Sequence, residues 1–297
     1  MMSFWQAVAL GTLQGVTEFL PVSSSGHLVL LRDILRLGEV PLLFDVLLHL
    51  STLAATALVF RARLGRLLAA GIDLLRPPVR RRSKPAERRL LLLLLLCTVV
   101  TGGIGMAIGS VGLPREPRLV AVLLLVTAAV LLAARFRRGQ AAPRRDPAPR
   151  GQAAPHGGAA TCAATVPGAV PVPGWQPRWR WALLVGAVQG LAVIPGISRS
   201  GATIAAGVLA GADRESAADF SFLASVPAIL GAVAVSLPEL SALEAAVDPA
   251  ALIAGMAVSF AAGWLALTVL LRIVRRGRLH LFAIYLIPAG IVGLTVL

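Results

Sequence analysis

The stretch Gln14–His27, QGVTEFLPVSSSGH, places a carboxylate, three serines and an imidazole around one proline, Pro21. It lies in a chain of 297 residues, of which 57% are hydrophobic, and the mean hydropathy is +0.81. Proline interrupts a helix, and serine is a favoured residue at the start of the next one. The stretch therefore predicts a broken helix that carries polar groups into an apolar protein.

Six apolar runs elsewhere have the length of a membrane-crossing helix, about 18–20 residues. They cover residues 43–61, 89–110, 118–136, 216–236, 250–273 and 279–297. Two further apolar segments, 4–37 and 178–211, are each broken by proline into pieces too short to cross. We therefore expect an all-α polytopic membrane protein with six transmembrane helices and two re-entrant broken-helix hairpins.

The two broken segments share a pattern at a constant offset along the chain. The offset relates Gly11–Gly15 to Gly186–Gly190, Ser25–Gly26 to Ser200–Gly201, and Phe44–Asp45 to Asp219–Phe220. Each half, 1–137 and 175–297, then consists of one hairpin followed by three spans. Because three is odd, the second half enters the membrane inverted relative to the first. We predict an inverted-topology repeat within one integral membrane domain.

The formal net charge of +14 is unevenly distributed. Most Lys and Arg residues fall in 61–89, 135–180 and 272–278, which lie on one side if every long run crosses once. The positive-inside rule makes these segments cytoplasmic, so both termini face outside and the first hairpin enters from outside. The segment 138–174, rich in Ala, Pro and Gly, is predicted to be a flexible cytoplasmic linker.

Basic proteins often bind nucleic acid, but topology and anionic lipid headgroups account for the charge of these loops. We therefore predict membrane lipids as partners and no nucleic acid. The two cysteines, Cys97 and Cys162, lack the spacing of a metal site or a disulfide framework.

The polar residues of the two hairpins share a plan that suits an anion. Gln14 and Glu18 are four residues apart and lie on one helical face. In the second hairpin, PGISRSGAT at 195–203 again places serines before a helix and adds Arg199. Two helix N-termini directed at one place favour a phosphate, and arginine can donate to it in a bidentate manner.

Each of these residues also has an ordinary structural explanation. A serine can simply cap a helix, an arginine and a glutamate can form a stabilising pair, and a histidine can be a hydrogen-bonded core residue. The matched occurrence in both hairpins favours a functional site. His49, His156 and His280 lack such neighbours in the sequence, and we assign them no role.

The motifs EFLPVSSSGH and PGISRSGAT, with DFSFLASVP at 219–227, resemble the undecaprenyl-pyrophosphate phosphatase family, also called bacitracin-resistance proteins. The resemblance covers nearly the whole chain apart from 138–174. It implies hydrolysis of the diphosphate of a C55 polyprenyl carrier lipid to the monophosphate and inorganic phosphate. The reaction would take place on the outer side of the bacterial cytoplasmic membrane and recycle the carrier for peptidoglycan synthesis.

The resemblance also implies a set of site residues. The catalytic residues would be Glu18, Ser24, His27 and Arg199. Ser198, Ser200 and Thr203 match the polar neighbours of the arginine in this family. With Ser23, Ser25, Gly26 and Gly201, which lie at the predicted helix starts, they form the predicted substrate-binding residues. A divalent cation, Mg²⁺ or Ca²⁺, would be held by Glu18 together with Gln14. Many members have glutamate in place of Gln14, so Glu18 is the stronger candidate ligand.

Some alternatives stay open at this point. Ser24 could attack phosphorus directly, or His27 could activate a water. A lipid or anion transporter, or a flippase, could use the same inverted-repeat site. The predicted substrate is a polyprenyl diphosphate lipid, and the sequence leaves the oligomeric state open, with a homodimer as one option.

Overall fold

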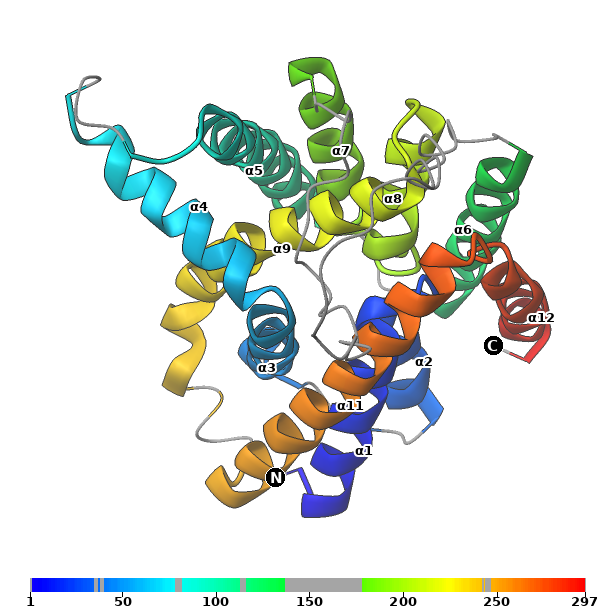
Figure 1. Cartoon of the computed structure of the whole chain (residues 1–297). Coiled ribbons are helices and arrows are strands. Elements are labelled where there is room, and N and C mark those ends of the chain that lie inside the picture. The colour runs from blue at the N-terminus through cyan, green and yellow to red at the C-terminus, as the bar shows by residue number, and fades with distance from the viewer. Residues whose placement is uncertain are drawn as a thin grey trace, which may run out of the picture.

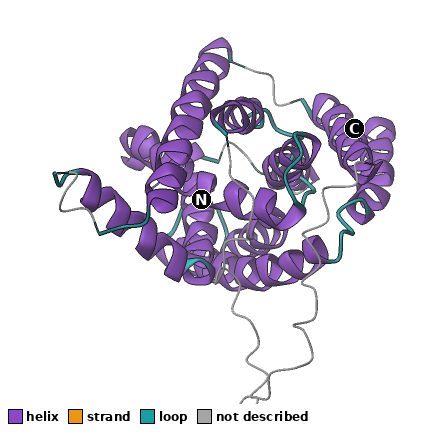
Figure 2. Cartoon of the chain, turned by 45° about the horizontal axis from the view of Figure 1, so that its top comes forward, coloured by secondary structure: helices purple, strands orange, loops and turns teal. Residues whose placement is uncertain are grey.

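The computed structural model describes residues 2–34, 37, 40–77, 82–112, 116–136, 178–241, 243 and 247–296. Within these ranges all regular elements are helices and no β-sheet is present (Figure 2). The predicted linker 138–174, with His156 and Cys162, lies outside the described residues. The all-α prediction is therefore confirmed for the part of the chain that is described.

The described helices follow the order expected from the apolar pattern (Figure 1). The first half contains α1 (Phe4–Phe19), α2 (Ser24–Ile34), α3 (Leu42–Val59), α4 (Arg61–Leu74), α5 (Pro85–Val111) and α6 (Pro117–Phe136). The second half contains α7 (Trp179–Leu191), α8 (Arg199–Leu209), α9 (Arg214–Ser236), the 3₁₀ turn η2 (Leu237–Glu239), α11 (Pro249–Arg275) and α12 (Leu281–Val296).

Among the residues that the structure describes, five helices are long and apolar enough to cross a membrane: α3, α5, α6, α9 and α11. They coincide with five of the six predicted runs, as expected for a multi-pass membrane protein. The sixth run, 279–297, forms α12, which has 16 residues. A helix of this length is shorter than a typical crossing helix, so its role as a span stays a prediction.

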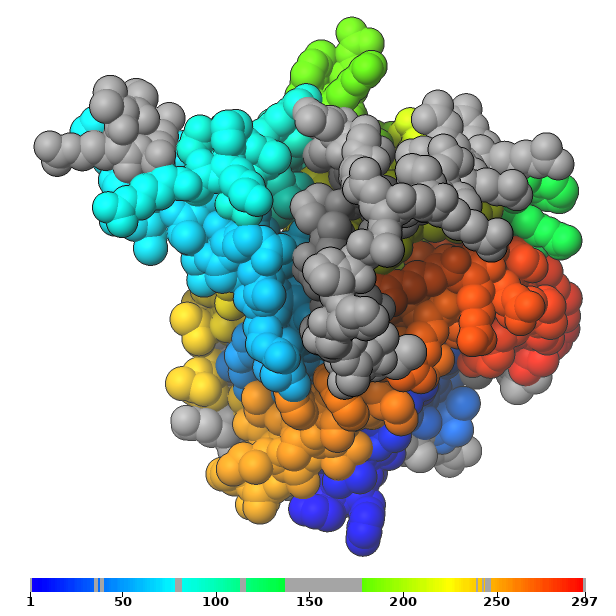
Figure 3. Space-filling view, in the orientation of Figure 1, coloured from blue at the N-terminus to red at the C-terminus, as the bar shows by residue number. Residues whose placement is uncertain are grey.

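The helix α4 was not predicted from the sequence. It occupies the first part of the basic segment 61–89, packs against α5, and runs toward the upper left edge of the molecule (Figure 3). Its Asp73 accepts the backbone N–H of Arg82 at 2.6 Å and that of Ser83 at 2.5 Å. These hydrogen bonds, that of Ser83 first, hold the pKa of Asp73 below its ordinary value. Asp73 thereby ties the end of α4 to the residues that precede α5.

Both predicted helix breaks are present. The first separates α1 from α2 at Leu20–Ser23, and the second separates α7 from α8. Ser23 takes a φ of 69° and Gly196 a φ of 99°, so each break contains a left-handed residue. For the second helix of each hairpin, 24–37 and 200–211 were expected, and the described helices are slightly shorter.

The two halves exchange helices in their packing. Helix α1 of the first half lies along α11 of the second, and α7 of the second half lies along α5 of the first (Figure 1). The contacts are close because glycine lies at each crossing. A Cβ on Gly11 would lie 2.2 Å from the carbonyl oxygen of Gly255, and one on Gly186 would lie 2.7 Å from that of Cys97.

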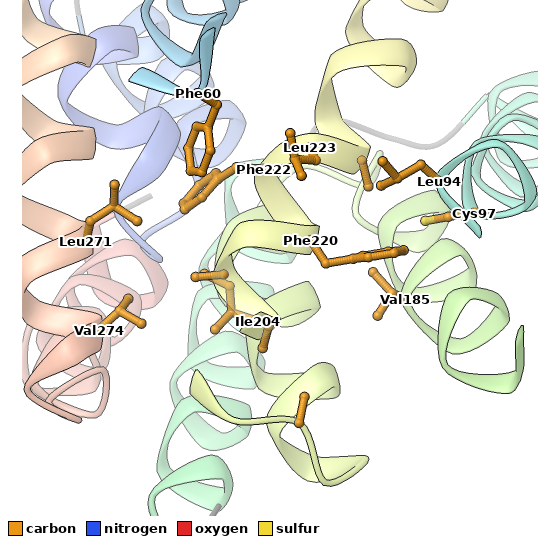
Figure 4. Close-up of a cluster of buried hydrophobic side chains, with 14 of the residues drawn as sticks. Phe60, Leu94, Cys97, Val185, Ile204, Phe220, Phe222, Leu223, Leu271 and Val274 are labelled. Carbon is orange, nitrogen blue, oxygen red and sulfur yellow. The ribbon is translucent and has the colours of Figure 1, made fainter. Parts of the chain in front are cut away.

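The largest core cluster surrounds α9 and draws on both halves (Figure 4). Phe220, Phe222 and Leu223 of α9 pack with Leu94 of α5 and Leu271 of α11. Among lipid tails, such packing stabilises the fold through close contact rather than through removal of apolar surface from water. The cluster therefore fixes α9 between the halves and positions the hairpins that precede it.

Candidate active site

The two helix breaks lie against each other. A Cβ on Gly26 would come 3.1 Å from Cα of Gly196, and one on Gly201 would come 2.9 Å from Cβ of Pro21. The Ser200 hydroxyl donates to the carbonyl of Leu20 at 3.3 Å, which joins the hairpins directly. The starts of α2 and α8 therefore converge, although they lie far apart in the sequence.

Several of the predicted substrate-binding residues have a structural role at this junction. The hydroxyl of Ser23 accepts the N–H of Gly26 at 3.3 Å, and that of Ser198 accepts the N–H of Gly201 at 3.1 Å. These two serines therefore act as helix caps. Thr203 donates its hydroxyl to the carbonyl of Arg199 at 2.7 Å, which helps to fix the first turn of α8.

Glu18, which is buried, forms the centre of a polar cluster. Its Oε2 accepts the hydroxyl of Ser24 at 2.7 Å and the amide Nε2 of Gln14 at 2.8 Å. Its Oε1 pairs with the guanidinium of Arg199, which comes from the second hairpin. His49 of α3 completes the cluster, with Nδ1 3.0 Å from Oε2 of Glu18.

His27 lies on the first turn of α2 and is held by two partners. Its Nδ1 is 2.8 Å from the carbonyl oxygen of Ser23, and its Nε2 is 2.6 Å from the hydroxyl of Tyr285 in α12. A carbonyl can only accept, so Nδ1 carries a proton, and Nε2 of the neutral ring accepts from Tyr285. The Ser24 hydroxyl donates to Glu18 and not to His27.

One oxygen atom near Glu18 is available as a ligand for a hard cation. The Oε1 atom of Gln14 is buried and has no hydrogen-bond partner. An amide oxygen beside a carboxylate is the kind of ligand that Mg²⁺ and Ca²⁺ accept. Within the described ranges, no group of three or more His, Cys, Asp or Glu side chains gathers as a metal site. Gln14 and Glu18 therefore fit the predicted cation with few protein ligands.

The family model described as bacitracin resistance protein BacA matches residues 7–170 and 173–292 of the chain. The chain belongs to this family. Similar proteins named undecaprenyl-diphosphatase cover nearly its whole length. One from Desulfosudis oleivorans is 40% identical over 300 residues, which are 98% of this chain and 97% of that protein. One from Treponema denticola is 36% identical over 298 residues, 99% and 97% of the two chains. One from Korarchaeum cryptofilum is 35% identical over the full length of both.

In this family member the structure brings most of the predicted residues to the hairpin junction. Direct contacts join Gln14, Ser24 and Arg199 to Glu18. The remaining predicted site residues lie at the starts of α2 and α8: Ser23, Ser25, Gly26, His27, Ser198, Ser200, Gly201 and Thr203. Gln14, Glu18, Ser24 and Arg199 therefore form one cluster, and the other predicted residues lie at the starts of the two helices that meet there.

Two residues of the cluster were missed. His49, to which no role was assigned, lies against Glu18, because α3 packs on α1. The sequence does mark His49 as an ionisable side chain within an apolar span. Burial of such a side chain in the membrane is energetically costly, and such residues are usually functional. Tyr285 is the one tyrosine of the chain. No local motif marks it, since its contact with His27 arises from tertiary packing alone.

Proposed function

We propose that the chain is a membrane phosphatase that hydrolyses undecaprenyl diphosphate to undecaprenyl phosphate and inorganic phosphate. Membership of the family and the name of the relatives support this function. The structural observation that carries it is the contact of the Ser24 hydroxyl with Glu18, whose carboxylate also pairs with Arg199. A candidate nucleophile, a candidate proton acceptor and a phosphate-binding guanidinium thus lie together. The reaction would return the carrier lipid to peptidoglycan synthesis.

The diphosphate would bind at the junction of α2 and α8. The N-termini of both helices present backbone N–H groups and a positive dipole end there. Arg199 would turn part of its guanidinium to the phosphate and offset the charge that spreads over the transferred group. Glycine at 26 and 201 permits the close contact of the two hairpins that sets this spacing.

Ser24 would attack the terminal phosphorus and pass its proton to Glu18, which lies within the hydrogen-bond distance that proton transfer needs. The new bond joins Oγ to phosphorus, and the bond to the bridging oxygen breaks, so the lipid monophosphate leaves. Water would then attack the phosphoserine. His27 Nε2 would exchange its hydrogen bond from Tyr285 for one from this water, take the proton and later release it to the departing phosphate. Ser24 would recover its own proton from Glu18. Inorganic phosphate is the second product.

A divalent cation, Mg²⁺ or Ca²⁺, would be held by Glu18 and Gln14. When bound, it would neutralise negative charge on phosphate oxygens. Glu18 would continue to hold Arg199 through its other oxygen, so the carboxylate links the cation side of the site to the arginine side.

The proposed membrane arrangement has six spans, α12 included, and two re-entrant hairpins, 4–37 and 178–211. The exchange of α1 and α7 between the halves, 1–137 and 175–297, supports an inverted repeat. Basic helix ends gather on one side: Arg63 pairs with Asp219, and Arg275 lies 3.2 Å from Glu215. By the positive-inside rule this side is cytoplasmic. Both termini and the entrance to the active site would then face the outside of a bacterial cytoplasmic membrane.

Labelling of single cysteines on intact cells tests this orientation. Cys97 and Cys162 are first replaced by alanine. A membrane-impermeant maleimide should then label Ala250→Cys, at the start of α11, and spare Arg276→Cys, just after its end. Labelling with the opposite pattern would reverse the proposed orientation.

Phosphate release by protein purified in detergent tests the function, because detergent leaves no second compartment for transport. Release of one phosphate per molecule of undecaprenyl diphosphate, lost in Arg199→Ala and in His27→Ala, is expected of the enzyme. Failure to release phosphate with any divalent cation would overturn the proposal and favour a transporter.

A further inference from the structure

Three polar atoms from α1 and α3 form a nearly equilateral triangle beside Ser24. Gln14 Nε2 lies 2.8 Å from Glu18 Oε2 and 2.7 Å from His49 Nδ1, and the last two atoms are 3.0 Å apart. Gln14 and Glu18 are buried, and the side chain of His49 is partly exposed.

Protons alone do not satisfy this triangle. The Glu18 carboxylate is paired with Arg199 and accepts from Ser24, so it is an acceptor. If His49 Nδ1 carries a proton, it faces the donor Nε2 of Gln14. If it does not, it faces the acceptor Oε2 of Glu18. In either case one edge of the triangle joins two groups of the same kind.

A metal ion would satisfy all three corners. A half-turn of the Gln14 amide exchanges Nε2 for Oε1, the atom that is now buried without a partner. The corners then become an amide oxygen, a carboxylate oxygen and an imidazole nitrogen, which are all lone-pair donors. In an octahedral complex with bonds of about 2.1 Å, adjacent ligands are about 3 Å apart. The edges of the triangle have this length.

We propose that Gln14, Glu18 and His49 form a three-donor face for a divalent transition-metal ion. The inference rests on the proposed function in that it specifies the cation of the same site. Imidazole suits Fe²⁺, Ni²⁺, Cu²⁺ and Zn²⁺, whereas Mg²⁺ and Ca²⁺ take oxygen ligands. The mixed nitrogen and oxygen face therefore favours a transition-metal ion over the Mg²⁺ or Ca²⁺ expected from the sequence, and Mn²⁺ can serve as its paramagnetic probe. Water and phosphate oxygens would fill the remaining positions.

The position of Arg199 sets a limit on the affinity. The guanidinium occupies Oε1 of Glu18, and Oε2 serves both the triangle and the Ser24 hydroxyl. Its positive charge opposes a nearby cation, and the face holds a single carboxylate. The diphosphate of a substrate would supply the missing negative charge, so we expect metal binding to strengthen when inorganic pyrophosphate is added.

Electron paramagnetic resonance of Mn²⁺ bound to the full-length protein in detergent tests the proposal. Spin-echo spectra should show coupling to a nitrogen nucleus, and this coupling should change when the histidines carry ¹⁵N. In His49→Gln the coupling should vanish, and the dissociation constant for Mn²⁺ should rise at least about tenfold, as metal sites respond when even supporting residues are lost. The matched control His280→Gln, in the turn between α11 and α12, should keep both properties.

Mn²⁺ that binds to the wild-type protein without nitrogen coupling would overturn the inference, even if His49→Gln fails to fold. Equal coupling in His49→Gln and the wild type would also overturn it. Phosphate release separates this result from the proposed function. Wild-type protein that releases phosphate but shows no nitrogen coupling refutes only the His49 ligand. Protein that shows the coupling but releases no phosphate with Mn²⁺, Mg²⁺ or Ca²⁺ refutes only the enzyme.

Discussion

Arg199 at the start of α8 pairs with Glu18 near the end of α1, a residue 181 positions earlier in the chain. The pair joins the two hairpins at their junction. A buried carboxylate that loses its counter-ion is strongly unfavourable, whereas loss of both charges costs much less. The pair therefore holds the hairpins together in addition to placing two groups of the proposed reaction.

Removal of one partner should destabilise the protein more than removal of both. We expect Arg199→Ala to reduce the free energy of unfolding by about 3–5 kcal/mol, because Glu18 stays buried without its counter-ion. The double variant Arg199→Ala/Glu18→Gln should recover most of this loss. Thermal unfolding in detergent measures both, with Arg61→Ala on the exposed side of α4 as control. A double variant as unstable as the single one would show that the pair contributes little to folding.

Ser24 should carry the phosphoryl group during turnover. Ser24→Ala should lower kcat by about a thousandfold or more, as expected for loss of a nucleophile. Mass spectrometry of acid-quenched protein should find phosphate on the peptide that contains Ser24. The exposed Ser110→Ala on α5 should leave kcat unchanged. If Ser24→Ala keeps most of its activity, the attack belongs to a water activated by His27.

Tyr285 should position His27. Tyr285→Phe keeps the ring stacked at 5.6 Å but removes the hydroxyl bonded to Nε2. One neutral hydrogen bond is worth about 0.5–1.5 kcal/mol, so kcat should fall by up to about tenfold. The pH dependence of kcat should shift, which a merely structural change would not produce. Thr295→Val, on the exposed side of α12, is the control. An unchanged pH dependence of kcat in Tyr285→Phe would show that Tyr285 does not position His27.

The helix crossings that contain glycine should be sensitive to the addition of a single methyl group. Gly11→Ala would place Cβ 2.2 Å from a backbone carbonyl of α11, so the helices must separate. Overpacking of this kind costs about 1–3 kcal/mol. Gly102→Ala on α5 meets nothing within 4 Å and should preserve or raise the melting temperature. Equal melting temperatures for the two variants would contradict the close crossing of α1 and α11.

Asp73 should make the connection before α5 sensitive to acid. Because hydrogen bonds from Ser83 and Arg82 lower the pKa of Asp73, its contribution is complete above the ordinary value of 3.8 and is lost as the pH falls through the lower folded value. Hydrogen exchange should show protected Arg82 and Ser83 amides at neutral pH and reduced protection below pH 3.8. In Asp73→Asn the protection of these two amides should be low both at neutral pH and below pH 3.8. Protection independent of pH in the wild type would contradict this role.

The sequence predicts the fold where the signal is local. Apolar length locates α3, α5, α6, α9 and α11, and proline with serine locates the two breaks. It misses α4, because a basic segment with scattered leucines gives no apolar run. It predicts that Glu18, Ser24 and Arg199 belong to one site, since these residues lie in continuous motifs, and the structure brings them into contact. His49 and Tyr285 escape, because each reaches the site only through helix packing that no local pattern encodes.

We propose that undecaprenyl diphosphate is hydrolysed at the hairpin junction. The most direct test compares inorganic phosphate released in detergent by the wild type and by the folded double variant Arg199→Ala/Glu18→Gln. We predict release by the wild type and a rate at least about a hundredfold lower for the double variant, because phosphate binding and proton acceptance are both lost. No release by the wild type with any divalent cation, or equal release by both proteins, would contradict hydrolysis at this junction.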